Sequence, residues 1–237
     1  MLDFIVYPLG KLMKIIYDFT GNYGVAIVLF TIVIRMALLP FSIKQTQSSK
    51  KMNVLSPKMK EIQEKYKNDK EQLNVKLMEL YKENNYNPAA GCLPTLLQMP
   101  ILFSLFYVLQ DPIKYVFSTK EAFALVHKSF LWISNVGLTE QAATIFSIPG
   151  IGGLPILAIL AGLTTWYQMR MIMPSGSNVD PTQKSMTMIM PFMFAFFTLN
   201  VPSGLAVYWV IGNFITIITQ YFLLGKKPAV AVKEVKK

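Results

Sequence analysis

The stretch YGVAIVLFTIVIRMALLPF, residues 23–41, is almost wholly apolar, and Arg35 is its only charged residue. A helix needs about 20 mostly apolar residues to cross the hydrocarbon core of a bilayer, so this stretch is expected to span a membrane. An arginine at the centre of such a helix costs about 2.5–3.5 kcal/mol on insertion scales. Arg35 therefore either reaches the lipid headgroups as an ordinary interfacial residue or faces a water-containing cavity among helices.

Four more apolar stretches follow the first one along the chain. Together they predict five transmembrane helices, at residues 21–42, 88–110, 151–173, 186–200 and 203–224. The 237 residues are 53% apolar and 15% charged, whereas a soluble domain has about 25% charged residues. The apolar content excludes a disordered chain, and the single cysteine, Cys92, excludes a disulfide scaffold. The expected fold class is an all-α integral membrane protein.

Lysine and arginine residues indicate which segments lie in the cytoplasm, because short cytoplasmic loops are enriched in them. The segment 43–87 has ten Lys and six acidic residues, and the tail 225–237 has five Lys and one Glu. By contrast, the segment 111–150 has three Lys and three acidic residues. We therefore expect 43–87, the loop 174–185 and the tail in the cytoplasm, and 111–150 and the N-terminus outside. The net charge of +10 is then a topology signal and not a nucleic-acid footprint.

Residues 1–20 differ from the five expected spans, because charged residues interrupt them. Their apolar residues recur at a spacing of three and four, at Ile5, Leu9, Leu12, Ile16 and Phe19. This periodicity is typical of an amphipathic helix, and we expect one that lies in the membrane interface. The alternative is a degenerate leader peptide, although no basic region precedes the apolar stretch and no small-residue cleavage site follows it.

The segment 43–87 is expected to form a cytoplasmic helical hairpin. Apolar residues at three- and four-residue spacing mark two arms: Met52, Leu55, Met59, Ile62 and Tyr66, then Leu73, Leu77 and Leu80. Two antiparallel helices packed along this seam explain the pattern. The hairpin is either a docking surface for a nascent chain, a ribosome or lipid headgroups, or an ordinary solvated hairpin with charge pairs along its helices.

Polar residues inside the expected spans are further candidates for a site around Arg35. Thr31 lies one helical turn before Arg35 on the same face. The other candidates are Gln98, Gln168, Tyr208 and a helical stripe of Trp209, Asn213, Thr216 and Gln220. We expect this stripe to face Arg35, although such residues taken singly are often hydrogen-bond partners between helices. No expected span contains Asp or Glu, which argues against a proton relay and leaves Arg35 to attract an acidic or polar peptide.

Methionines are concentrated at the inner ends of the third and fourth spans. Met169, Met173, Met190 and Met193 belong to this group. Flexible methionine side chains suit the binding of many unlike apolar partners, so we interpret these residues as an apolar slide, with lipid-facing filler as the alternative. The fourth span has only 14 apolar residues, which is about 21 Å of helix. A span this short can thin the bilayer locally.

Nothing in the sequence predicts an enzyme or a cofactor. The only histidine, His127, lies in the segment 111–150. The chain has no cluster of residues with metal-ligand spacing, no P-loop and no dinucleotide-binding motif. Cys92, at the end of a span, is interpreted as a packing residue.

Several short motifs are more specific together than each is alone. They are Gly21-Asn22-Tyr23-Gly24 with Thr31 and Arg35, Asn87-Pro88, Gly91-Cys92-Leu93-Pro94, Gln98-Met99-Pro100, Met190-Pro191, and Pro202-Ser203-Gly204-Leu205 with Tyr208-Trp209 and Asn213. With these motifs the chain resembles the YidC-type membrane protein insertases of the Oxa/YidC superfamily, in a short form without the large external domain.

The resemblance implies a five-helix core with a groove open to the cytoplasm and to lipid. In that groove Arg35 would receive hydrophilic parts of a client protein, and Thr31, Trp209 and Gln168 would contact clients. It implies a multi-pass insertase and chaperone of the bacterial cytoplasmic membrane, acting alone or with the Sec translocon. Its partners would be nascent membrane proteins and lipid, with the Sec translocon and the ribosome as further candidates. A small-solute transporter or channel, and a non-catalytic translocon assembly subunit, are the alternatives.

Overall fold

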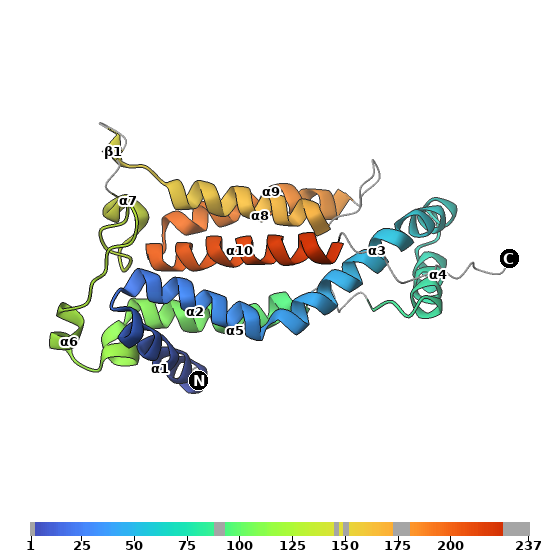
Figure 1. Ribbon diagram of the computed structural model, residues 1–237. Coiled ribbons are helices and arrows are strands. Elements are labelled where there is room, and N and C mark those ends of the chain that lie inside the picture. Colours follow the sequence, from blue (N-terminus) through green and yellow to red (C-terminus); the bar gives the residue numbers. More distant parts are fainter. Residues whose placement is uncertain (1–2, 88–92, 145–146, 149–151, 173–180, 225–237) are drawn as a thin grey trace.

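The chain folds as a bundle of long helices with a helical arm at one end (Figure 1). The computed structural model describes residues 3–87, 93–144, 147–148, 152–172 and 181–224. The long helices are α1 (Asp3–Thr20), α2 (Tyr23–Ala37), α3 (Leu39–Lys65), α4 (Lys70–Glu83), α5 (Leu93–Gln110), α8 (Ile156–Ile172), α9 (Pro181–Leu199) and α10 (Ser203–Leu224). The short elements are the π-helical turn η2 (Ile113–Phe117), α6 (Lys120–Ala124), α7 (Glu140–Ala143), and the antiparallel strands β1 (Ser147–Ile148) and β2 (Gly152–Gly153). Apart from this strand pair, the predicted helical class is confirmed.

The helices α2, α5, α8, α9 and α10 lie along the same axis and form the bundle (Figure 1). Helix α10 packs between α2 and α8, and α9 packs on the other side of α8. Large side chains that are fully buried fill the core of the bundle: Tyr23, Ile27, Phe30, Leu105 and Tyr208. Three helices, α2, α5 and α10, therefore meet along this core.

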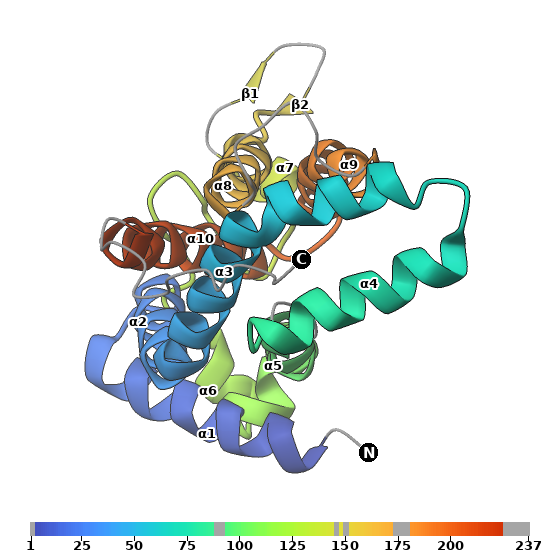
Figure 2. The same ribbon diagram turned by 90° about the vertical axis from the view of Figure 1, so that its right-hand side faces the viewer.

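Helix α1 crosses the end of the bundle instead of running along it (Figures 1 and 2). One face of α1 packs on α2, α5 and η2 and buries Val6 and Met13. Phe4 and Phe19 are exposed on the other side. The helix is therefore apolar on more than its packed face, and its orientation across the bundle suits a helix that lies in an interface.

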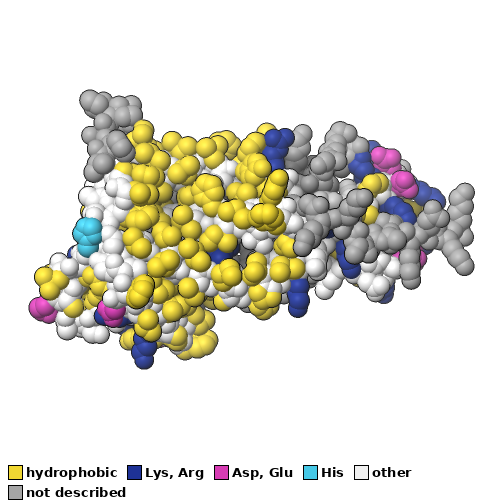
Figure 3. Space-filling view, in the orientation of Figure 1, with side chains coloured by type: hydrophobic (Ala, Val, Ile, Leu, Met, Phe, Trp, Pro, Cys, Tyr) yellow, Lys and Arg dark blue, Asp and Glu magenta, His cyan; other side chains and the backbone are white. Residues whose placement is uncertain are grey.

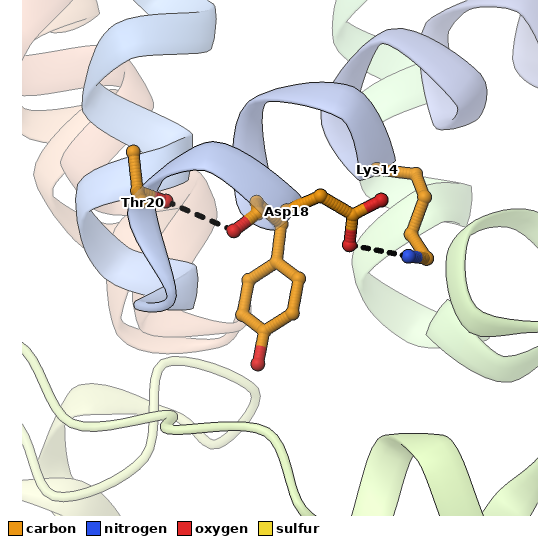
Figure 4. Close-up of polar contacts among 4 residues, drawn as sticks. Lys14, Asp18 and Thr20 are labelled. Atoms are coloured by element: carbon orange, nitrogen blue, oxygen red, sulfur yellow. Dashed lines mark hydrogen bonds and ion pairs between the residues drawn. The ribbon is translucent and has the colours of Figure 1, made fainter.

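The end of α1 is fixed by local hydrogen bonds. Lys14 pairs with Asp18 one turn later, and the hydroxyl of Thr20 donates to the carbonyl of Tyr17 at 3.4 Å (Figure 4). Gly21 follows with φ +67°, and its N–H donates to the same carbonyl at 2.8 Å. A glycine in this left-handed conformation is a common way to end a helix, because it has no side chain to strain.

Large apolar side chains cover much of the outside of the bundle, and charged side chains gather toward its two ends (Figure 3). Exposed apolar residues occur on every bundle helix, for example Val33, Phe103, Leu163, Phe192 and Phe214. Buried positions, by contrast, include many polar residues: Thr31, Ser104, Thr164, Thr165, Thr198, Asn213, Thr216 and Gln220. An apolar exterior around a partly polar interior suits lipid as the surrounding solvent.

Helix α10 is the clearest membrane-spanning candidate by length and composition. Its segment Ser203–Leu223 has 21 residues and a mean hydropathy of 1.4. The pair α2 and α3 meets the same criterion only if it is counted as one span, bent by 60°. The apolar parts of α5 and α9, Gln98–Gln110 and Thr187–Leu199, are shorter. The described residues thus contain one or two helices that satisfy the criterion, and five spans remain a prediction.

The bend between α2 and α3 changes the position of Arg35 within its helix. Helix α2 ends at Ala37, and α3 begins at Leu39 with Pro40 in its first turn. Proline fits the start of a helix, but it has no N–H to continue the hydrogen-bond ladder of a preceding one. The structure therefore differs from the unbroken helix expected over 21–42. As a result, Arg35 lies in the last turn of α2.

Helix α9 is longer than the helix expected over 186–200. It begins at Pro181 and has 19 residues, which is about 28 Å of helix. Its apolar part is still short, because that part begins at Thr187. The argument for local thinning of the bilayer therefore concerns the apolar part of α9 and not its whole length.

Helices α3 and α4 pack on each other and form the arm (Figure 2). Their shared apolar cluster consists of Leu55, Leu80 and Tyr86, surrounded by Met52, Met59, Ile62 and Tyr81. Asp69 is the N-cap of α4, and its side chain accepts the N–H of Gln72 at 3.0 Å. Burial in this cluster raises the pKa of the Tyr86 hydroxyl above its ordinary value. The cytoplasmic location of the arm remains a prediction.

One buried carboxylate anchors the segment between α5 and α8. Glu140, the first residue of α7, is fully buried. Its carboxylate accepts the backbone N–H groups of Leu157 at 2.8 Å and Ala158 at 3.3 Å, and the Nε1–H of Trp132 at 3.1 Å. The first N–H groups of a helix have no partner within the helix and favour an anion. Glu140 therefore caps α8 from outside that helix.

Candidate functional site: the polar cluster around Arg35

Arg35 lies where α2 ends, and the structure keeps its charge partly inside the protein. The residue is half-buried, and its Nε is fully buried without a hydrogen-bond partner among the described residues. The C-terminus of a helix carries a partial negative charge, so a cation in the last turn is favoured there. The ion pairs Lys14–Asp18 and Lys76–Glu79 lie elsewhere in the described structure and do not involve Arg35. The guanidinium is thus a partly desolvated cation without a carboxylate partner in the described structure.

Helices α5 and α10 supply the groups around this cation. The guanidinium packs against α10 at Gly212. Tyr208, one turn earlier on α10, is fully buried. Gln98 of α5 donates its Nε2–H to the Tyr208 hydroxyl at 2.6 Å. The structure therefore brings together three of the predicted site residues, Arg35, Gln98 and Tyr208, and adds Gly212, which the sequence analysis missed. We call these four residues the Arg35 cluster.

Trp209 and Asn213 of the polar stripe on α10 contact α8 and not Arg35. Trp209 donates its Nε1–H to Thr165 on α8 at 3.2 Å. Asn213 donates to the hydroxyls of Thr164 at 3.0 Å and Thr165 at 2.9 Å. The expectation that this stripe faces Arg35 is wrong for Trp209 and Asn213, because neighbouring helical positions differ by about 100° in direction. The face of α10 toward Arg35 holds Gly212 and Tyr208, whereas the next face holds the α8 contacts.

Thr31 and Gln168 are placed less directly. Thr31 is fully buried, and its hydroxyl donates to the carbonyl of Ile27, one turn earlier in α2, at 2.7 Å. It is close to Arg35 in sequence, but it does not reach the surface in this conformation. Gln168 is half-buried near the end of α8, and no described hydrogen bond joins it to the Arg35 cluster. A contact between either residue and a client remains a prediction.

The expected apolar slide is found partly on the outer face of α9. Met193 is exposed, Met169 and Met190 are half-buried, and Met173 lies outside the described residues. The exposed face of α9 also carries Met188, Ile189, Phe192, Phe196 and Phe197. The aromatic residues among them were not predicted, although Phe192 and Phe196 lie four residues apart in the sequence. We call these exposed residues, with Met193, the α9 apolar face.

A small apolar recess lies where α9 approaches α5 and α10. It is lined by Leu102, Phe197, Thr198, Val201, Leu205, Ala206 and Trp209. Trp209 also stacks on Phe194 of α9, with ring centroids 4.1 Å apart. The recess therefore joins the α9 apolar face to the helix that carries Gly212 and Tyr208.

Comparison with known proteins assigns the chain to a family. The family model described as 60Kd inner membrane protein matches residues 15–229. The chain belongs to this family. Three relatives, each named Membrane protein insertase YidC, come from Syntrophobacter fumaroxidans (41% identical over 221 residues), Wolinella succinogenes (38% over 236) and Geobacter sulfurreducens (36% over 217). These alignments cover 93%, 98% and 91% of this chain but only 38%, 40% and 36% of the relatives.

The chain thus spans about two-fifths of the length of these YidC relatives. The whole Arg35 cluster and the α9 apolar face lie within the segment that the family model matches. In the described part of this YidC-type chain, no three His, Cys, Asp or Glu residues are placed to hold a metal ion. The names of these relatives denote the insertion of membrane proteins.

Proposed function

We propose that the chain is the core of a bacterial inner membrane insertase and chaperone. The Arg35 cluster is the observation that carries the proposal. A cation that has lost part of its hydration and has no carboxylate partner is costly, and a polar or acidic ligand lowers that cost. The predicted ligand is a hydrophilic segment of a nascent membrane protein, held in a partly hydrated groove. Family membership and the names of the relatives support this function.

The proposed mechanism has two non-covalent steps. In the first, Arg35 attracts the hydrophilic segment of the client, while Gln98 and Tyr208 offer further polar groups. In the second, the apolar helix of the client moves along the α9 apolar face and half-buried Met169 and Met190 into lipid. The hydrophobic effect drives this transfer at roughly 25 cal/mol per Å² of apolar surface removed from water. No chemical bond changes, so the proposed mechanism requires no catalytic residue or cofactor.

The orientation is part of the proposal. Segment charges place the α3–α4 arm, residues 174–185 and the C-terminal tail in the cytoplasm, with the N-terminus and 111–150 outside. The bend at Leu38 then lies on the cytoplasmic side, and it connects the Arg35 cluster directly to the arm. We propose that the arm meets clients on arrival, with the Sec translocon or a ribosome as further partners.

Reconstitution of the purified chain into liposomes tests the function. A short membrane protein with a polar external tail is synthesised in the presence of these liposomes, and protection of its tail from added protease measures insertion. An insertase gives protected tails without any other protein. A channel would give flux of small solutes instead, and an assembly subunit would give no insertion by itself. Either of the last two results would contradict the proposal.

A further inference from the structure

The contact between Arg35 and α10 depends on a glycine. A Cβ atom built at Gly212 has Arg35 as its nearest neighbour: Nη2, Nε and Cζ of the guanidinium are its three nearest heavy atoms. Its distances to Nε and Cζ would be 2.8 Å and 3.0 Å, well inside ordinary contact distances. The guanidinium therefore occupies the space that any other side chain at position 212 would need.

The helical backbone at position 212 does not itself require a glycine. Position 212 is in the interior of α10, and alanine is normally favoured over glycine in a helix interior. The backbone there is helical and already bonded, because the Thr216 hydroxyl donates to the Gly212 carbonyl at 2.8 Å. Gly10 differs, because a Cβ there would collide with the backbone of Tyr115. At Gly212 the atoms in the way all belong to the end of one flexible side chain.

We propose that Gly212 is a positioning residue for Arg35, and this inference rests on the proposed function. Without a side chain at 212, the guanidinium packs directly against α10, one turn from Tyr208. A methyl group at 212 would displace the guanidinium and leave the helix in place, since a flexible side chain moves more easily than a packed backbone. The charge would remain but would no longer be held where a client's polar segment meets it.

A double-mutant cycle tests the inference, with Gly212→Ala, Arg35→Ala and the double variant in the full chain. Gly162→Ala is the matched control, because Gly162 is also a helical glycine at a helix contact but adjoins Ala195 and Pro191 of α9. Insertion into liposomes is measured for two clients that differ only in whether the external tail is acidic or neutral. Thermal unfolding in detergent is measured for every variant.

We expect Gly212→Ala to slow insertion of the acidic-tail client roughly three- to tenfold, as the loss of one hydrogen bond of ordinary net strength would. The neutral-tail client should insert at nearly the wild-type rate. In the Arg35→Ala background the same change should add almost nothing, because no guanidinium remains to be displaced. Gly162→Ala should not distinguish between the two clients. If Gly212→Ala lowers the melting temperature, removing the Arg35 side chain should restore it.

Three results would overturn the inference. If Arg35→Ala slows the acidic-tail client and Gly212→Ala does not, Gly212 has no positioning role, although the proposed function stands. If Gly212→Ala slows both clients equally, Gly212 is an ordinary packing residue. The same conclusion follows if Gly212→Ala slows insertion in the Arg35→Ala background. If Arg35→Ala itself inserts both clients at the wild-type rate, the proposed role of the charge fails, and the inference fails with it.

Discussion

Replacing Glu140 with alanine should destabilise the protein more than any other change of a single charge outside the bundle. The side chain is fully buried and accepts hydrogen bonds from Leu157 N, Ala158 N and Trp132 Nε1. Loss of a helix cap costs about 0.5–2 kcal/mol, and each buried donor left without a partner costs about 1–3 kcal/mol. Leu157 N and Ala158 N form the cap and Trp132 Nε1 is one further donor, so the cap and this donor together give about 1.5–5 kcal/mol. We expect a total of about 2–4 kcal/mol.

Thermal unfolding in detergent measures this effect. For a chain of this size, 1 kcal/mol corresponds to about 2–4 °C, so Glu140→Ala should lower the melting temperature by roughly 5–15 °C. Glu140→Gln keeps an acceptor oxygen but loses the charge at the helix N-terminus, and it should cost about 1 kcal/mol. Glu121→Ala is the control, because Glu121 is an exposed carboxylate in the same segment. A melting temperature of Glu140→Ala within 1–2 °C of the control would refute the capping role of Glu140.

Three further predictions address other parts of the molecule. Asn213→Ala removes two hydrogen bonds to α8 and should cost about 1 kcal/mol; an unchanged melting temperature in detergent would show that these bonds add no stability. Phe192→Ser on the α9 apolar face should leave the melting temperature unchanged but slow insertion of client helices, and insertion at the wild-type rate would contradict the proposed slide. Burial raises the pKa of Tyr81 and Tyr86, so these tyrosines lose their protons at lower pH in the unfolded arm than in the folded arm. The stability of the folded arm should therefore fall above about pH 10. If phenolate absorbance rises at the same pH in the native and the denatured sample, this prediction is wrong.

A bundle helix could be predicted from the sequence where the length of an apolar stretch sets the bounds of the helix. Apolar length located a helix over 203–224, and α10 begins at Ser203 and ends at Leu224. Whether α10 crosses a bilayer remains a prediction. The break at Leu38 was missed because residues 38–42 are mostly apolar, which concealed the effect of Pro40 on the helix.

The site was harder to predict, because its members depend on how α10 is rotated in the bundle. Periodicity grouped Trp209 with Asn213 correctly but could not show which neighbouring helix they face. Gly212 could not be found by a search for polar residues, since its contribution is the space it leaves for Arg35. In the sequence, Glu140 was only one of the charged residues of the segment 111–150. It lies 17 residues before Leu157, and no sequence pattern shows that its carboxylate accepts the Leu157 N–H.

The central claim is that the charge of Arg35 receives the polar segments of clients. The most direct measurement compares wild-type chain with Arg35→Ala and Arg35→Lys in liposomes, over several clients that carry acidic or neutral external tails. We expect Arg35→Ala to slow the acidic-tail clients by roughly tenfold or more, as loss of a hydrogen-bonded partner for a partly desolvated charge would. Arg35→Lys should restore part of the rate. Insertion of all acidic-tail clients by Arg35→Ala at the wild-type rate would contradict the claim.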